Sequence, residues 1–247
     1  MANQLSGKLI LVTGAGSGIG RSTSGLLKDY GAKVIAADCN LNAAEQTAKD
    51  LGGETIALEI NVTSLESVRK AVESIYQQFK TTPSVVVNSA GITRDGYLLK
   101  MTEDDYDDVY KVNLKGTFLV TQQFAKAMIN NGITGGSIIN ISSIVAKLNN
   151  IGQSNYAASK AGVISLTEVA SKEFGKFGIR VNSILPGYIN TPMVAVVPQH
   201  IKDEVAKRCP LGRMGEPREV AEVIAFLASD RSSYVNGAAI EITGGLK

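Results

Sequence analysis

The sequence of 247 residues has only two cysteines and one histidine. Cys39 and Cys209 are too few for a disulfide framework or a cysteine-rich metal cluster. Because His200 is the only imidazole, zinc sites built on several histidines and hydrolases that use a Ser-His-Asp triad are both disfavoured. The composition therefore predicts no metal site and favours a reducing compartment.

The sequence also lacks a charge excess and a long apolar run. The formal net charge is +2, which gives no electrostatic reason to expect nucleic acid or a membrane surface as a partner. No apolar run approaches the roughly 20 residues that a membrane-spanning helix needs. The N-terminal residues MANQLSGK are typical of neither a signal peptide nor an arginine-rich transit peptide. We therefore expect a soluble intracellular protein.

Short β-branched apolar runs alternate with longer helical stretches along the chain. Continuous apolar runs of this kind are typical of parallel strands that are buried on both faces. The expected strands are 9–13, 33–37, 55–60, 84–88, 137–142, 179–185 and 238–242. The expected helices are 18–31, 41–51, 64–79, 103–131, 155–178 and 217–229. This alternation predicts one α/β domain over 1–247, a doubly wound parallel sheet of about seven strands with helices on both faces.

A glycine-rich turn, TGAGSGIG, follows the first expected strand and opens the first expected helix. In a phosphate-binding turn of this kind, the glycines permit a tight bend, a close approach of backbone to pyrophosphate, and close packing of helix on sheet. No Gly-Lys-Ser/Thr ending is present, so a P-loop is disfavoured. The residues expected around the pyrophosphate are Gly14, Ser17, Gly18, Ile19 and Gly20. The alternative is a tight turn without a ligand.

Asp38 closes the second expected strand, 18 residues after the last glycine of that turn. A carboxylate there can accept hydrogen bonds from the adenosine ribose and repels a 2′-phosphate. Its neighbour Cys39 is not cationic, whereas a 2′-phosphate site needs arginine or lysine. The sequence therefore favours NAD over NADP, with a helix N-cap as the alternative role for Asp38. We expect Asn61 and Val62, at the end of the third strand, to frame the adenine.

Tyr156 and Lys160 stand four residues apart in the run SNYAASKAG, on one face of an expected helix. A free tyrosine has a pKa near 10. A nearby ammonium lowers that pKa, whereas burial raises it. The ammonium would therefore have to lie very close, and a second positive charge, such as an oxidised nicotinamide, would help. Such pairs also occur on solvated helix faces, so the pair alone does not establish catalysis.

The stretch 191–216 interrupts the alternation with three prolines and a short helical piece around 199–208. It follows the end of a strand, where ligands bind in open α/β sheets. Its apolar residues are Met193, Val194, Val196 and Val197. We expect a lid over an apolar substrate, with an ordinary surface excursion as the alternative.

Further short motifs complete a recognisable order. They are NSAG at 88–91, Asn113 in VNLKG, Ser143 in ISS and the pair Pro186-Gly187. Together with the glycine turn and the tyrosine–lysine pair, these motifs resemble the short-chain dehydrogenase/reductase family over residues 8–245. The resemblance implies a Rossmann-like fold and an oxidoreductase that acts on a secondary alcohol or ketone with NAD.

Within that family, the segments 84–121 and 137–163 are similar to the 3-oxoacyl-acyl-carrier-protein reductase branch. They are most similar to a subgroup of NAD-dependent 17β-hydroxysteroid dehydrogenases. Two positions depart from the family pattern, because Ser89 stands where a second asparagine is common and Asn61 stands where an acid is common.

The resemblance implies a role for each matching residue. Tyr156 would be the general acid/base, and Lys160 would lower its pKa and hold the nicotinamide ribose. Ser143 would bond the substrate oxygen. Asn113 would hold a water that links Lys160 to solvent, and an asparagine inside a helix also predicts a polar partner or a helix distortion. The other cofactor-binding residues implied are Asn88, Ala90, Gly91, Pro186, Gly187, Ile189 and Thr191.

The leading hypothesis is interconversion of a 3-hydroxyacyl thioester, of CoA or acyl-carrier protein, with its 3-oxoacyl form. Two alternatives stay open: a 17β-hydroxysteroid (estradiol) dehydrogenase, and an NAD-binding supporting subunit of a hetero-oligomeric 3-oxoacyl reductase. The resemblance also implies a mitochondrial matrix location and a homotetramer, or a heterotetramer with a related reductase subunit. Its interfaces would use 103–131, 155–178 and 234–247. Lys176 is a candidate for docking an acidic carrier, whereas Thr134 stands where another basic residue is expected.

Overall fold

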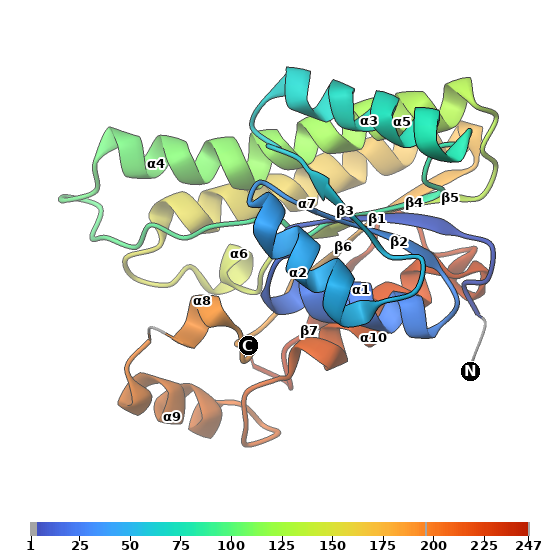
Figure 1. Cartoon of the computed structure of the whole chain (residues 1–247). Coiled ribbons are helices and arrows are strands. Elements are labelled where there is room, and N and C mark those ends of the chain that lie inside the picture. The colour runs from blue at the N-terminus through green and yellow to red at the C-terminus, as the bar shows by residue number, and fades with distance from the viewer. Residues whose placement is uncertain (1–3, 196, 247) are drawn as a thin grey trace.

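The computed structural model describes residues 4–195 and 197–246, and its centre is one parallel sheet of seven strands (Figure 1). The strand order is β3-β2-β1-β4-β5-β6-β7, and every neighbouring pair is parallel. The strands are β1 (Leu9–Thr13), β2 (Lys33–Asp38), β3 (Ile56–Glu59), β4 (Val85–Asn88), β5 (Gly136–Ile141), β6 (Ile179–Pro186) and β7 (Ala239–Ile242). The expected doubly wound sheet is confirmed.

Helices cover both faces of this sheet. The α-helices are α1 (Gly18–Asp29), α2 (Leu41–Leu51), α3 (Leu65–Phe79), α4 (Glu103–Val109), α5 (Thr117–Asn130), α6 (Val145–Leu148), α7 (Ser154–Phe174), α8 (Pro192–Ala195), α9 (Gln199–Arg208) and α10 (Pro217–Ala228). The other helical segments are the π-helical η1 (Tyr110–Gly116) and the 3-10 helices η2 (Gly175–Phe177) and η3 (Asp230–Ser232). Figure 1 shows α1, α2 and α10 on one face and α3, α5 and α7 on the other. Among the described residues, no helix combines the length and the apolarity needed to cross a bilayer.

The strands read as continuous apolar runs because alternate side chains enter two different cores. In β1, Ile10 and Val12 pack with the cluster that includes Leu27 of α1. Leu9 and Leu11 pack on the opposite face, with the cluster that includes Phe124 of α5. Full burial of each such aliphatic side chain stabilises the fold by about 1.5–3 kcal/mol. The five residues of β1 therefore contribute to the hydrophobic cores on both faces of the sheet.

The chain reverses its winding direction at β1, which pairs with β2 on one side and with β4 on the other. In open α/β sheets, the crevice beyond the carboxyl ends of the strands at such a switch point is the usual ligand site. The glycine turn follows β1 directly, and residues 89–91 follow β4, so both expected cofactor segments meet at this crevice.

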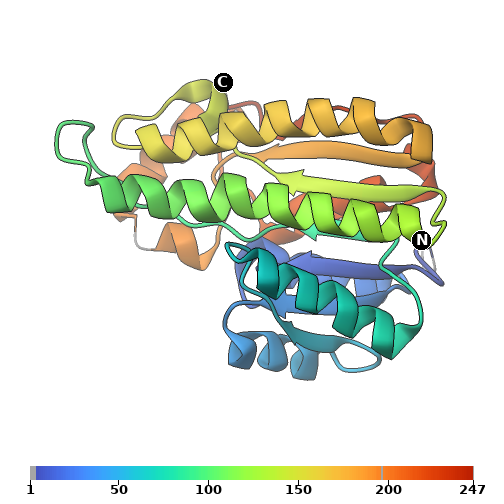
Figure 2. The same cartoon turned by 90° about the horizontal axis from the view of Figure 1, so that it is seen from above.

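The expected helix 103–131 is one rod with an interruption. Figure 2 shows α4, η1 and α5 as a continuous rod beside α7. Its middle, η1, is π-helical and contains the fully buried Asn113. The helix distortion expected at Asn113 is therefore confirmed. The short helices α6 and α8 were not expected from the sequence.

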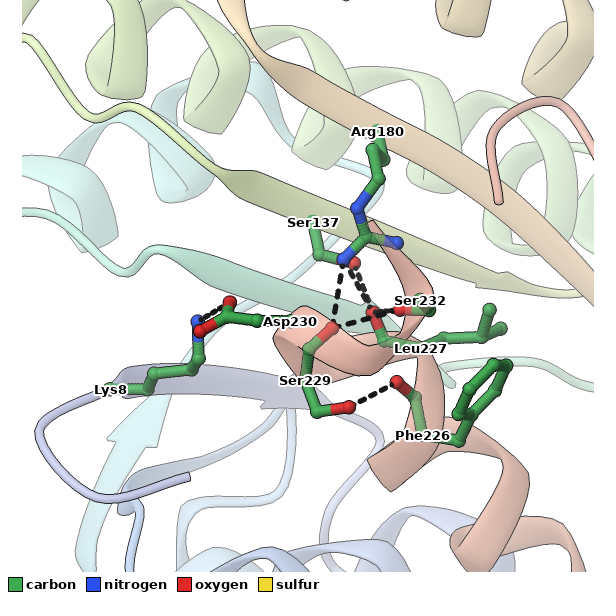
Figure 3. A network of polar contacts seen from close by, with 8 residues as sticks. All are labelled: Lys8, Ser137, Arg180, Phe226, Leu227, Ser229, Asp230 and Ser232. Atoms are coloured by element: carbon green, nitrogen blue, oxygen red, sulfur yellow. Dashed lines mark hydrogen bonds and ion pairs between the residues drawn. The ribbon is translucent and has the colours of Figure 1, made fainter. Parts of the chain in front are cut away.

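A polar network fastens α10 to the amino edge of the sheet (Figure 3). The Arg180 guanidinium on β6 donates to the carbonyl oxygens of Leu227, at 2.9 Å, and of Ser229, at 3.4 Å. Ser137 on β5 donates its hydroxyl to the same Leu227 carbonyl at 2.8 Å. The last carbonyls of a helix have no intrahelical donor, so these side chains supply the missing partners. This edge is the one opposite the crevice.

Candidate active site

A cavity of about 450 Å³ lies beyond the carboxyl ends of strands β1 to β6. Most residues predicted from the sequence line it. They are Gly14, Ser17, Gly18, Ile19, Gly20, Asp38, Cys39, Asn61, Val62, Ala90, Gly91, Ser143, Tyr156, Lys160, Pro186, Gly187, Ile189 and Thr191. Asn88 and Asn113 do not line the cavity. Segments far apart in the sequence therefore share one continuous wall.

The glycine turn has no room for side chains. Gly14 and Gly18 have φ angles of 66° and 52°, a region that other residues rarely adopt. A Cβ on Gly14 would lie 2.8 Å from the Cα of Ala90, and a Cβ on Gly20 would lie 2.2 Å from the carbonyl oxygen of Gly14. The glycines of this turn therefore let the start of α1 pack closely against the backbone at the end of the sheet.

The N-terminus of α1 opens on the cavity with unsatisfied donors. Its N-cap residue, Ser17, makes no side-chain capping hydrogen bond, and the first turn contains no acidic residue. The first backbone N–H groups of a helix have no intrahelical acceptor, and the helix dipole adds partial positive charge there. Thr191 faces Gly18, where an added Cβ would lie 3.4 Å from the threonine methyl. This cradle fits the pyrophosphate of a dinucleotide.

The carboxylate of Asp38 is held in place by two backbone donors. Its Oδ2 accepts from the N–H of Gly16 at 3.0 Å, and its Oδ1 accepts from the N–H of Asn40 at 3.0 Å. The cap of α2 is Asn40, whose side chain accepts from the N–H of Ala43. Asp38 is therefore not the N-cap, and its oriented carboxylate lines the cavity.

The expected adenine frame lies beside the π-helical segment. Asn61 Oδ1 accepts from the N–H and the hydroxyl of Thr63, at 3.0 and 2.8 Å, so its amide is fixed locally. Val62 packs against η1, where a Cβ on Gly116 would lie 2.8 Å from a Val62 methyl carbon. Asn61 and Val62 both line the cavity.

Ser143, Tyr156 and Lys160 meet at the inner end of the cavity. Tyr156 is in the first turn of α7 and Lys160 is one turn later. Lys160 Nζ donates to the carbonyl oxygen of Ile141 at 2.8 Å and lies 5.6 Å from the centre of the Tyr156 ring. Ser143 follows β5 and hydrogen-bonds Tyr156.

Burial controls the proton affinities of this group. The Tyr156 side chain is partly buried, and this burial raises its pKa to about 12. The Ser143 hydrogen bond acts in the opposite direction, and the charge of Asp95 adds to the rise. Burial lowers the pKa of Lys160 to about 8. Within the protein's own groups the Tyr156 pKa is therefore raised, and the fall that was expected from Lys160 is not found.

Asn113 of η1 lies behind the cavity wall and connects η1 to α7 and to the loop that follows β4. Its Oδ1 accepts from the N–H of Ile92 at 2.9 Å, and its Nδ2 donates to the Ile92 carbonyl at 3.0 Å and to Ser159 Oγ at 3.2 Å. A Cβ on Gly91 would lie 3.3 Å from Asn113 Oδ1 and 3.5 Å from Lys160 Nζ. The lack of a side chain at Gly91 therefore lets the asparagine and the lysine approach one point.

Asn88 lies beneath the cavity wall instead of on it. Its side-chain nitrogen donates to Thr121 Oγ1 at 3.0 Å and to Asn140 Oδ1 at 2.8 Å. These hydrogen bonds connect β4 to α5 and to β5 directly beneath the cavity.

A group of hydrogen-bonded polar residues at the cavity, here called the polar rim, was not found from the sequence. It consists of Asp95, Asn150, Gln153 and Tyr188. Gln153 Nε2 donates to Asp95 Oδ2 at 3.0 Å, and Asn150 Nδ2 donates to Gln153 Oε1 at 3.0 Å and to the Tyr188 hydroxyl at 3.1 Å. Asp95, Gln153 and Tyr188 line the cavity. The only sequence signal was the position of Gln153, three residues before Tyr156.

The segment 191–216 contributes an aliphatic wall through its first residues. Met193, Val194 and Val197 line the cavity, whereas no residue of α9 does. Val196, which was also expected in this lining, is outside the described residues. The cavity mouth therefore has a polar rim and, from this segment, an aliphatic wall.

The expected carrier-docking position is not at the cavity. Lys176 lies in η2, directly before β6, and Thr134 lies directly before β5. Both are therefore at the amino edge of the sheet, opposite the cavity. Within a single chain, Lys176 is therefore not placed to dock an acidic carrier beside the cavity.

Comparisons with known proteins find relatives that match almost the whole chain. A family model described as enoyl-(acyl carrier protein) reductase matches residues 14–247. The (3R)-3-hydroxyacyl-CoA dehydrogenase of Homo sapiens is 51% identical over 256 residues, covering 100% of this chain and 98% of that protein. The 3-oxoacyl-acyl-carrier-protein reductase of Thermotoga maritima is 48% identical over 246 residues, covering 98% of this chain and 99% of that protein. A short-chain type dehydrogenase/reductase structure from Mycobacterium marinum superposes with a TM-score of 0.94 at 34% identity, covering 98% of this chain and 96% of that one.

Proposed function

Because the chain belongs to the short-chain dehydrogenase/reductase family, we propose that it is an NAD-dependent oxidoreductase that interconverts 3-hydroxyacyl and 3-oxoacyl thioesters. The names of its human and Thermotoga relatives support a CoA or acyl-carrier thioester as substrate. The observation that carries the proposal is the joint placement of Ser143, Tyr156 and Lys160 in one cavity with Asp38 and the glycine turn.

NAD is the proposed cofactor, and when bound it accepts or supplies the hydride and brings a positive charge in its oxidised form. The N-terminus of α1 would hold the pyrophosphate, and Asp38 would accept from the adenosine ribose. Among the described residues that line the cavity, Lys160 is the only cation, and it is bonded to Ile141. A 2′-phosphate beside Asp38 would therefore meet a carboxylate without a compensating guanidinium or ammonium.

Proton transfer is proposed to run between the Tyr156 hydroxyl and the substrate oxygen. With a pKa of about 12, Tyr156 is a phenol at neutral pH, which suits protonation of the alkoxide formed when a ketone is reduced. Oxidation of the alcohol needs the phenolate instead, and positive charge beside the ring lowers the cost of forming it. Ser143 would donate a hydrogen bond to the substrate oxygen as its charge develops.

The aliphatic wall supports an acyl chain as the apolar part of the substrate. Met193, Val194 and Val197 lie on the wall, and we propose that the segment 191–216 closes over the bound chain. Closure would exclude water from the developing alkoxide and strengthen the hydrogen bond from Ser143.

Purified protein is expected to oxidise (R)-3-hydroxybutyryl-CoA with NAD, with a kcat/KM at least about tenfold above the value with NADP, or about 1.4 kcal/mol. Initial rates from the absorbance of the reduced cofactor check this, with estradiol as the second substrate. A preference for NADP would contradict the role of Asp38. Turnover of estradiol without turnover of the thioester would contradict the proposed substrate.

The matched variants for the cofactor preference are Asp38→Ala and Glu45→Gln. Asp38→Ala removes the carboxylate from the cavity. It is expected to lower the ratio of kcat/KM with NAD to kcat/KM with NADP by about tenfold. Glu45→Gln removes the same charge from the exposed face of α2, away from the cavity wall, and is expected to leave the ratio unchanged.

We propose an oligomer, either a homotetramer or a heterotetramer with a related reductase subunit. Exposed apolar side chains on the rod and on α7 support this, because such patches commonly mark interfaces. They are Tyr106, Tyr110, Phe118 and Val169. The mass of the purified chain in solution distinguishes a homo-oligomer from a chain that needs a second subunit. A mitochondrial matrix location stays a prediction of the sequence resemblance.

A further inference from the structure

The charges on the cavity wall are few and unevenly placed. Among the described lining residues, the charged side chains are Asp38, Asp95 and Lys160. Asp38 is at the adenosine end, and Lys160 is 4% exposed and bonded to the Ile141 carbonyl at the inner end. Asp95 is left as the charge of the polar rim.

No cation of the rim offsets this carboxylate. Among the described residues, Asp95 bonds only the neutral amide of Gln153, and the other rim residues, Asn150 and Tyr188, are also neutral. Its neighbour Arg94 is exposed, does not line the cavity, and donates to the Thr93 carbonyl. The rim therefore presents a net negative charge to whatever enters beside it.

The substrate end that meets this rim follows from the two kinds of wall. An alkyl chain pairs with Met193, Val194 and Val197, which leaves the polar C1 end of a 3-hydroxyacyl compound toward the rim. In a free 3-hydroxy acid, C1 is a carboxylate, whereas in an ester or thioester it is neutral. Two carboxylates in a partly desolvated cavity repel each other, because the local dielectric is below that of water.

We propose that Asp95 is a specificity-determining residue that excludes free 3-hydroxy acids and admits their neutral esters and thioesters. This inference rests on the proposed function. It implies that a fatty acid must be activated as a thioester before this protein acts on it. Burial raises the pKa of the Asp95 carboxyl and the Gln153 hydrogen bond lowers it. Because Asp95 is partly exposed to solvent, salt should weaken its effect.

The test compares three small substrates that differ in charge at C1: (R)-3-hydroxybutyrate, its ethyl ester and its choline ester. In Asp95→Asn, the kcat/KM of the acid relative to the ethyl ester is expected to rise about fivefold, the size expected for one partly exposed charge pair. The cationic choline ester is expected to fall relative to the ethyl ester. In the wild type, added salt should reduce the difference in kcat/KM between the acid and the ethyl ester, and also that between the choline ester and the ethyl ester.

The variant keeps an oxygen that can accept from Gln153, so the rim can persist without its charge. Asp95→Glu retains the charge and is expected to keep the wild-type order of substrates. Asp104→Asn removes an exposed carboxylate from the first turn of α4, outside the cavity wall, and is expected to change neither ratio. If Asp95 had a purely structural role, its substitution would change kcat/KM for all three substrates in the same direction.

Failure of the inference and failure of the proposed function give different results. If Asp95→Asn leaves both ratios within about twofold of the wild type while the ethyl ester is oxidised, the charge-selection role is wrong. If the wild type oxidises neither the ethyl ester nor (R)-3-hydroxybutyryl-CoA, the proposed function itself is wrong.

Discussion

Replacing Tyr156 by phenylalanine is expected to lower kcat for (R)-3-hydroxybutyryl-CoA by about 10³-fold, within the range known for general acid–base groups. The change removes the hydroxyl that would exchange the proton and leaves the ring in place. Cofactor affinity is expected to stay within about twofold, because the glycine turn and Asp38 supply the proposed anchoring contacts. Steady-state rates and a fluorescence titration with NADH measure the two quantities separately.

Tyr188→Phe is the matched control for this variant. Tyr188 also lines the cavity, but its hydroxyl belongs to the polar rim, where it accepts from Asn150. Its loss is expected to change kcat by less than about tenfold, as for a hydrogen bond that is not part of proton transfer. Equal rates for the wild type and Tyr156→Phe, with both proteins folded, would remove Tyr156 from the mechanism.

Lys160→Met is expected to lower kcat by about 10²-fold and, at the same time, to change how stability depends on pH. Burial lowers the pKa of Lys160 to about 8 in the folded protein, against an ordinary value of 10.5. Below pH 8 the folded state must hold a buried ammonium, which costs about 3 kcal/mol at pH 7 relative to the unfolded chain. Methionine has a similar shape and no charge, so this cost is absent in the variant.

The sign of the pH effect follows from proton uptake. Between about pH 8 and 10.5 the unfolded chain holds a proton on Lys160 that the folded protein has lost, so the wild type gains stability as pH rises. Relative to Lys160→Met, the free energy of unfolding should rise by about 3 kcal/mol from pH 7 to pH 10.5. Urea unfolding of the cofactor-free proteins at several pH values measures this difference.

Lys172→Met separates this effect from a general loss of charge. Lys172 is on the same helix, α7, but is exposed. Its substitution is expected to leave both kcat and the pH dependence of stability near the wild-type values. If the free energy of unfolding had the same pH dependence in the wild type and in Lys160→Met, burial would not lower the pKa of Lys160.

The parts of the site that are local in sequence were predictable. The glycine turn, the carboxylate of Asp38 and the pair Tyr156 and Lys160 each depend on neighbours within a few residues and on one following or preceding element. The expected strand bounds also agree with the structure to within one residue at every end, because buried parallel strands carry an apolar run of their own length.

The parts that depend on tertiary packing were not predictable. The polar rim joins Asp95, Gln153 and Tyr188 from three separate segments, and none of them has a local pattern that marks it. Asn88 and Asn113 carry residue types that suit a ligand, but their amides are used between secondary structure elements. The opposing effect of burial on the Tyr156 pKa depends on depth in the protein, which a motif does not encode.

The π-helical segment η1 has a consequence for how this chain can change in length. A π-turn accommodates one more residue than an α-turn, and each residue of an α-helix advances by about 100°. Deleting one residue from 110–116 would convert the π-turn into an α-turn and keep α4 and α5 in phase, whereas deleting one residue from α5 itself would rotate the rest of that helix by about 100°. The first deletion would displace the Asn113 amide from Ile92, and the second would turn part of the buried face of α5 toward solvent. The rod can therefore lose a residue at this turn without rotating α5, and the loss falls on the contacts of Asn113.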